Sequence, residues 1–157
     1  MTKSIITSTE VLAIAFSDGE YIPAEAIAEA DIVAATERWV TPVVGSVLLE
    51  KVAQGDYAEL RDYLSTAIAF HTRLMVQPRL NASTSLLGLT VGGGSSRRAS
   101  DEGLRRELMR SLRTRARQAL RALSEYLEQN KASYKEYNDK ENILKKCCCD
   151  GGFVQIH

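Results

Sequence analysis

Apolar residues recur every three or four positions along most of the chain, and this spacing is typical of amphipathic helices. The first such segment spans residues 7–15, where Thr7, Ser8 or Thr9 can cap the helix and Glu10 suits its first turn. A second segment begins near Pro23. Its apolar stripe consists of Ala24, Ile27, Ala28, Ile32, Ala35 and Trp39. The pattern therefore predicts a short helix followed by a longer one.

Proline and glycine divide the next part of the chain. Pro42 removes a hydrogen-bond donor and disfavours helical geometry at Thr41, so we expect a kink or a new helix start there. The helix then continues to Gly55. A third helix is predicted between Asp56 as its N-cap and Pro78 as its stop, with His71 among its apolar positions. We interpret His71 as a histidine at the edge of the core with a satisfied hydrogen bond.

The fourth predicted helix is long and has two distinct sides. It begins after Ser100 as its N-cap and runs from Asp101 to Lys131. Its predicted core stripe consists of Leu104, Leu108, Leu112, Ala116, Ala119, Leu120, Leu123 and Leu127. Another side carries arginines at spacings of four, three, four and four, which form one continuous stripe: Arg106, Arg110, Arg113, Arg117 and Arg121.

A long connection, residues 77–100, separates the third and fourth predicted helices, and a polar tail covers residues 138–157. Loops of this length are uncommon unless they are functional or disordered. The apolar middle of the loop is expected to pair with a neighbouring chain or to fold over its own helices; it comprises Leu86, Leu87, Leu89 and Val91. The predicted fold is mainly all-α: a four- to five-helix bundle forming one domain over residues 1–157, with room for short β segments in the loop and the C-terminal tail.

Composition adds an uneven distribution of charge. The formal net charge of the 157 residues is zero, yet residues 1–56 hold three basic and nine acidic side chains, 3 − 9 = −6. Residues 97–121 hold nine arginines and three acids, 9 − 3 = +6. The two halves can neutralise each other within a monomer or between identical neighbours. No apolar run reaches the roughly 18 to 20 residues of a membrane span, and the N-terminus is a poor signal peptide, so we expect a cytoplasmic protein.

Residues that carry common chemistry are few. Cys147, Cys148 and Cys149 are consecutive, which suits neither a disulfide framework nor the separated ligands of a metal site. His71 and His157 are the two histidines, and nothing around His71 in the sequence completes a nucleophilic triad. The glycine-rich stretch in the loop lacks the phosphate-binding pattern. We therefore expect no enzyme activity, no catalytic residue, no cofactor and no metal.

The arginine stripe has three interpretations. It can be a solvated face whose stems cover apolar surface, or a nucleic-acid site in which arginines neutralise phosphates. It can also be a protein interface, because arginine forks well onto carboxylates. We favour the interface, with Glu25, Glu29 and Glu37 of a neighbouring copy as partners, a heterologous contact that can close into a ring.

The order of helices, and one stretch in particular, resembles a known family. Within residues 34–45 the pattern is Ala35, Glu37, Trp39, Val40, Pro42 and Gly45. This resembles the head-tail connector, or head-completion adaptor, proteins of long-tailed bacteriophages and prophages, most closely a variety found in phages of gut Bacteroides-type bacteria. The Cys147–Cys149 tail is not part of the resemblance.

The resemblance implies a structural protein rather than an enzyme. Family members form rings, commonly of twelve subunits, that dock beneath the portal, continue the DNA channel without sequence specificity and present a surface to a tail-side adaptor. Such a subunit would be found in the host cytoplasm during assembly and then in the virion. The hypothesis that follows pairs the arginine stripe with the glutamates of an adjacent subunit and lets the 86–91 loop reach a neighbour or the portal. The main alternative is a small helical protein that binds nucleic acid through Arg105–Arg121, and a further one is a small cytosolic regulator.

Overall fold

The computed structural model describes residues 4–16, 22–83 and 102–146, and all regular elements in these ranges are helices. This confirms the predicted mainly all-α fold. The described part of the C-terminal tail, 138–146, contains turns and no strand. The remaining β segments foreseen in the loop and tail lie outside the described residues.

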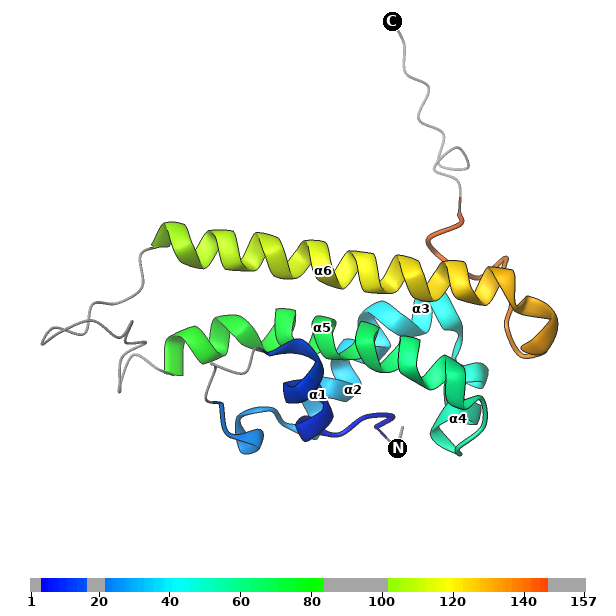
Figure 1. The fold of residues 1–157 in the computed structure, drawn as a ribbon, viewed down its shortest axis with the longest axis horizontal. Coiled ribbons are helices and arrows are strands. Elements are labelled where there is room, and N and C mark those ends of the chain that lie inside the picture. The colour runs from blue at the N-terminus through cyan, green and yellow to red at the C-terminus, as the bar shows by residue number, and fades with distance from the viewer. Residues whose placement is uncertain (1–3, 17–21, 84–101, 147–157) are drawn as a thin grey trace, which may run out of the picture.

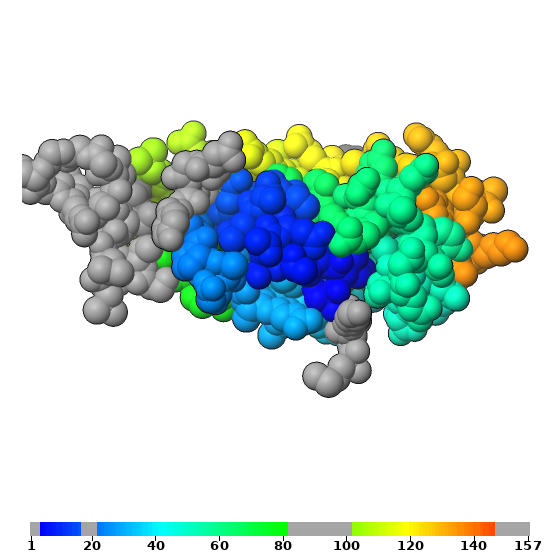
Figure 2. Space-filling model, turned by 60° about the horizontal axis from the view of Figure 1, so that its bottom comes forward, coloured from blue at the N-terminus to red at the C-terminus, as the bar shows by residue number. Residues whose placement is uncertain are grey.

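Two long antiparallel helices form the axis of the molecule (Figure 1). α5 (Ala58–Ser83) lies beside α6 (Glu102–Gln129), and α1 (Ser8–Ala15) and α2 (Glu29–Ala35) pack against α5 on the side away from α6. The face made by α1, α2 and α4 (Ser46–Ala53) comes forward in Figure 2, with α6 behind it. α5 is therefore the central layer of the fold.

The first helix is fixed at both ends. Thr7 accepts a hydrogen bond from the Glu10 N–H at 3.3 Å, and the Glu10 carboxylate accepts one from the Thr7 N–H at 2.8 Å, which is a capping box. Arg61 of α5 pairs with Glu10 at 2.8 Å. At the other end the buried Arg73 donates to the carbonyl of Ala15. The predicted N-cap is confirmed, and α5 holds α1 by its termini.

The prediction of one long second helix from Pro23 is wrong, because the structure divides this segment into separate elements. A 3-10 turn, η1 (Ala24–Ala26), is followed by two extended residues and then by α2. The extended Ile27 lies in the core, with 3% exposure. The Ala28 N–H, just before α2, donates to the Asp31 carboxylate at 3.0 Å. Burying Ile27 thus takes precedence over continuing the helix.

The new helix start predicted at Thr41 and Pro42 is confirmed, but the expectation that this helix continues unbroken to Gly55 is wrong. A π-turn, η2 (Thr36–Val40), leads into α3 (Thr41–Val44), where Pro42 occupies a first-turn position that needs no donor. The break comes at Gly45, whose φ of 87° is accessible to glycine and rarely to other residues. The helices on either side of Gly45, 29–44 and 46–53, are bent by 117° relative to each other.

The end of α4 is correctly predicted at Gly55, but Asp56 is not the N-cap of α5. Gly55 donates to the Val52 carbonyl at 3.0 Å and Asp56 to the Lys51 carbonyl at 3.1 Å, the pattern of a Schellman motif. Tyr57, with φ of 59°, stands between this motif and the start of α5. The Asp56 backbone N–H therefore belongs to the motif that ends α4.

Pro78 does not stop the third helix, since α5 continues to Ser83, and the predicted 77–100 loop begins later than expected. Pro78 faces water, where the carbonyl that loses its partner can be hydrated. Beyond it, Arg79 pairs with Asp31 of α2 at 2.6 Å and donates to the Ala26 carbonyl at 3.0 Å. These contacts hold the last turn of α5 in place despite the proline.

α6 buries most of its predicted stripe but not its first member. Leu112, Ala116, Leu120, Leu123 and Leu127 are buried. Leu104 is 57% exposed, so its assignment to the core is wrong. Among the described elements only α5 lies beside this end of α6, because α1 and α2 pack farther along α5 (Figure 1).

The segment after α6 folds back and ties the bundle together. Asn142 is completely buried and donates to Ser124 and to the Tyr137 hydroxyl, both at 2.8 Å. The next residue, Ile143, donates its N–H to the Pro42 carbonyl at 3.1 Å. Burial raises the pKa of Tyr137 to about 12, so its hydroxyl keeps its proton in this network. The first part of the predicted tail is therefore an integral part of the fold.

The interpretation of His71 is confirmed: it is 3% exposed, and its Nδ1–H donates to the Ala67 carbonyl at 2.8 Å. Burial lowers the pKa of His71 below its ordinary value of 6.5. The unfolded chain then binds a proton below pH 6.5 that the folded chain does not. We expect the free energy of unfolding to decrease as the pH falls from about 6.5, by at most about 1.4 kcal/mol per pH unit.

Urea denaturation between pH 7.5 and 5 checks this expectation. His157 is replaced by Gln in both proteins compared, so that His71 is the histidine by which they differ and the difference between their pH dependences belongs to it. The His71→Gln variant is expected to lose the dependence in this range. An equal pH dependence with and without His71 would contradict the assignment.

Among the described residues, no single helix has both the length and the apolar character to cross a membrane. Helices 29–44 and 46–53 are long and apolar enough only when they are taken together, and a 117° bend lies between them.

Candidate functional site

The predicted arginine stripe is exposed along α6. All five side chains are exposed: Arg106, Arg110, Arg113, Arg117 and Arg121. On an ideal helix they fall within a sector of about 80° and extend over about 22 Å. Arg106 forms an ion pair with Glu102 one turn earlier. In the part of the chain that the structure describes, the other four form no ion pair.

The predicted acidic partners lie on elements other than α6. Glu25 belongs to η1, Glu29 to the first turn of α2, and Glu37 to the π-turn, and all three are exposed. None of them forms an ion pair with another described residue. Asp31 differs from them, because its hydrogen bond from Arg79 holds the pKa of its carboxyl below the usual value.

The two charged surfaces are therefore separated within one molecule. The stripe lies on α6, whereas Glu25 and Glu29 lie on η1 and α2, and Glu37 lies on the π-turn between α2 and α3. No described stripe arginine pairs with any of these three glutamates. The pairing predicted between adjacent copies stays a prediction. Both sets of side chains are exposed and do not pair with each other within the described part of the molecule, as a contact between copies requires.

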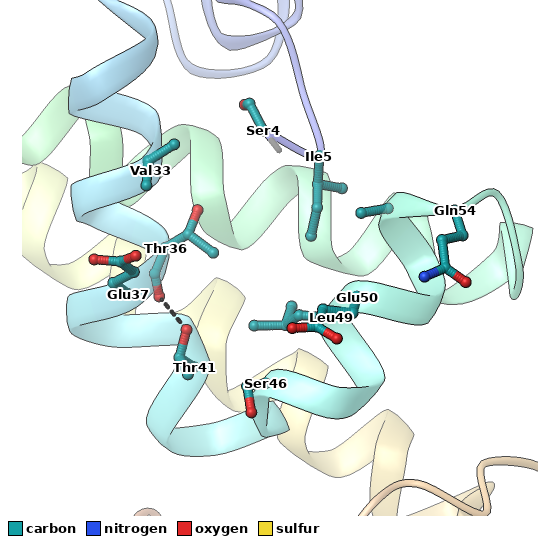
Figure 3. Close-up of a pocket in the computed structure, with 11 residues that line it drawn as sticks. Ser4, Ile5, Val33, Thr36, Glu37, Thr41, Ser46, Leu49, Glu50 and Gln54 are labelled. Atoms are coloured by element: carbon teal, nitrogen blue, oxygen red, sulfur yellow. Dashed lines mark hydrogen bonds between the residues drawn. The ribbon is translucent and has the colours of Figure 1, made fainter. Parts of the chain in front are cut away.

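Sequence reasoning missed a pocket of about 410 Å³ at the corner where the chain bends (Figure 3). The π-turn forms one wall and α4 the other, with the N-terminal segment at the edge. Its apolar lining comprises Ile5, Val33, Leu49 and Ala53. Its polar lining comprises Ser4, Thr36, Glu37, Thr41, Ser46, Glu50 and Gln54. The pocket thus combines hydrocarbon walls with two carboxylates.

The π-turn shapes this pocket. The Thr41 N–H reaches the Thr36 carbonyl five residues back, and the Thr41 hydroxyl donates to the same carbonyl at 3.2 Å. The Thr36 hydroxyl donates to the Ile32 carbonyl at 2.8 Å. Both threonines are therefore satisfied internally. Glu37 and Glu50 have neither a hydrogen-bond nor an ion-pair partner among the described side chains, which leaves them as the groups available to a ligand.

Only Glu37 of the pocket acids could be singled out from the sequence. Glu50 looks like one more solvated acid on a helix, and only the bend at Gly45 brings it to the same corner. The spacing of residues carries no signal for this proximity. A glycine close behind a proline in a helical pattern is the one hint that the chain turns here.

Several predicted residues cannot be placed. The loop residues Leu86, Leu87, Leu89 and Val91 lie outside the described residues, as do Cys147, Cys148 and Cys149. Across residues 4–16, 22–83 and 102–146, no three His, Cys, Asp or Glu side chains gather as a metal site would require.

Comparison with known proteins gives a family and no function. No curated protein and no solved structure matches the chain. A family model matches residues 33–146, from α2 through the segment that folds back to Pro42, and leaves α1 and η1 outside. Since this match covers most of the 157 residues, the chain belongs to DUF6712, a family of unknown function.

Proposed function

We propose that this protein is a structural subunit that assembles head to tail into a ring, as the subunit of a phage or prophage head-tail connector. One observation supports the assembly: four exposed arginines on α6 and three exposed glutamates on η1, α2 and the π-turn have no ion-pair partner among the described residues. The connector role is supported by the sequence resemblance over residues 34–45. No reaction and no cofactor form part of this role.

Two different, oppositely charged surfaces on one subunit favour a heterologous contact. Such a contact leaves an unused surface at each end of a dimer, and the series closes into a ring when the rotation permits it. Exposed ion pairs contribute only about 0.2–1 kcal/mol each, so several are needed, and a stripe of five can supply them. Charge complementarity also determines the register in which subunits meet.

The stretch that carries the resemblance lies at the pocket corner of the structure. Its Glu37 lines the pocket, its Pro42 lies in the first turn of α3, and its Gly45 makes the bend. In the proposed ring this corner belongs to the subunit contact. The flanking surfaces face the portal on one side and a tail-side adaptor on the other, around a channel through which DNA passes.

Reversing the charge of two arginines tests the assembly. We expect the wild-type protein to form closed oligomers in native mass spectrometry that dissociate at high salt, and the variant Arg110→Glu/Arg113→Glu to remain monomeric. Repulsion from the facing glutamates replaces attraction at the centre of the stripe. The matched control, Arg115→Glu/Lys140→Glu, carries the same net charge change at exposed positions outside the stripe and is expected to assemble. A wild-type monomer at every concentration and salt would contradict the proposal.

The second candidate, nucleic-acid binding, is favoured by the same unpaired arginines, since phosphates would satisfy them. A protein that makes five phosphate contacts should show a log-log salt slope of roughly −4 to −5 in duplex DNA titrations. The same double variant separates the two functions. Loss of DNA binding with oligomers intact would favour this candidate, and loss of oligomers without DNA affinity in the wild type would favour the ring.

A further inference from the structure

We propose that the pocket at the α2–α4 corner is the receptor for an arginine of the stripe on α6 of a second copy. This inference rests on the proposed head-to-tail assembly and names the acidic partner within it. The acids that attract the guanidinium are Glu37 on the π-turn wall of the pocket and Glu50 on its α4 wall (Figure 3). Glu25 and Glu29, two of the three acids that the sequence pattern suggests, do not line it.

The chemistry of the pocket fits this side chain. An arginine has a hydrocarbon stem and a planar cationic head, and the stem prefers apolar walls such as Val33 and Leu49. The head seeks carboxylates that accept paired hydrogen bonds. A volume of about 410 Å³ lies within the roughly 300–1,000 Å³ of small-molecule sites, so a long side chain can enter.

The charge of the pocket is not used within the molecule. The hydroxyls of Thr36 and Thr41 donate to backbone carbonyls. The side chains of Glu37 and Glu50 have no hydrogen-bond or ion-pair partner among the described residues. Asp31, also on α2, already holds Arg79 at 2.6 Å. Two unpaired carboxylates beside apolar walls are complementary to a cation that also buries hydrocarbon, and a second copy offers a row of such cations on its α6.

The position of the pocket fits the same partner. It lies at the corner between the π-turn and α4, and no stripe arginine forms an ion pair with Glu37 or Glu50 among the described residues, so the pocket is left for an arginine of another molecule. The family match contains both pocket glutamates and all five stripe arginines, whereas Glu25 and Glu29 precede it. A contact that uses the pocket therefore lies wholly within the part of the chain shared with the family.

Isosteric removal of the pocket charges is the first test. In Glu37→Gln/Glu50→Gln the size of both side chains is kept, and because both are exposed in the monomer the fold should be unchanged. We expect subunit association, measured by sedimentation velocity, to weaken by at least about thirtyfold, as when one partner of an interfacial charge pair is truncated. The matched control is Glu25→Gln/Glu29→Gln, which should associate as the wild type does.

Mixing two defective variants is the sharper test. Glu37→Gln/Glu50→Gln keeps an intact stripe, and Arg110→Glu/Arg113→Glu keeps an intact pocket; the pocket variant is neutral rather than basic, so that it cannot pair with the reversed stripe. Each variant alone is expected to be monomeric, and an equal mixture is expected to give one-to-one dimers and no larger species, because one functional contact remains per pair. If the pocket variants assemble normally while the stripe variant does not, the pocket is not the receptor and the proposed ring stands. If neither the wild type nor any mixture associates, both proposals are overturned.

Discussion

Replacing Leu123 by alanine is expected to lower the free energy of unfolding by about 3 kcal/mol, within the range of roughly 2–5 kcal/mol for such substitutions. Leu123 has no solvent exposure and belongs to the main hydrophobic cluster together with Leu64 of α5. The loss combines the transfer free energy of the removed methyl and methylene groups with the cavity that remains. The closely packed surroundings can fill such a cavity only in part.

Leu104→Ala is the matched control, because it makes the same chemical change on the same helix at an exposed position. Its effect is expected to stay within about 0.5 kcal/mol. Urea denaturation followed by circular dichroism measures both variants, with comparison of the m-values to check that the transition remains two-state. A large effect at Leu104 would mean that the helical period alone, rather than the observed packing, identifies the core.

The parts of the fold that local chemistry determines could be predicted from the sequence. The capping box of Thr7 and Glu10, the end of α4 at Gly55 and the long amphipathic α6 each follow from residues close together in the chain. The arginine stripe could be predicted for the same reason, since the spacing of its residues follows the helical period. The structure adds that every one of these arginines is exposed.

The errors occur where a distant contact outweighs a local preference. Pro78 disfavours helix, yet Arg79 just beyond it reaches Asp31, and α5 continues. Ile27 fits a helical stripe, yet it is buried in an extended conformation. The pocket is the clearest case, because it joins three stretches of chain, and no spacing within one stretch indicates that Glu37 and Glu50 share a cavity.

Seen together, these observations change where the acidic half of the proposed contact lies. The sequence pattern gives Glu25, Glu29 and Glu37 equal weight as three acids near one helix. In the structure Glu25 and Glu29 lie on η1 and at the start of α2, outside the pocket. Glu37 lines the pocket together with Glu50. Whether the corner is formed correctly should therefore determine both the stability of the monomer and its association.

Gly45→Ala is the variant that tests this corner, and we expect it to lower the free energy of unfolding by about 1–3 kcal/mol. At φ 87° and ψ 147° the backbone occupies a region that is essentially restricted to glycine. Apart from Gly45 and its two chain neighbours, no atom of the described residues lies within 4 Å of the position an alanine Cβ would take, so the cost arises from the backbone conformation. Alanine would favour joining α3 and α4 into one straight helix, but straightening would pull the buried Leu48 and Val52 of α4 out of the core.

The comparison with asparagine makes the Gly45 prediction specific. Asparagine tolerates the left-handed helical region but not this extended region of positive φ, so Gly45→Asn should cost as much as Gly45→Ala. At Gly55, in the Schellman motif that ends α4, Gly55→Asn is expected to cost less, because asparagine is accepted at that position. Denaturant titration gives the stabilities, and sedimentation velocity shows whether the Gly45 variants also associate more weakly. A Gly45→Ala protein as stable as the wild type would mean that the bend between α3 and α4 does not require glycine, and that the pocket is not held open by this residue.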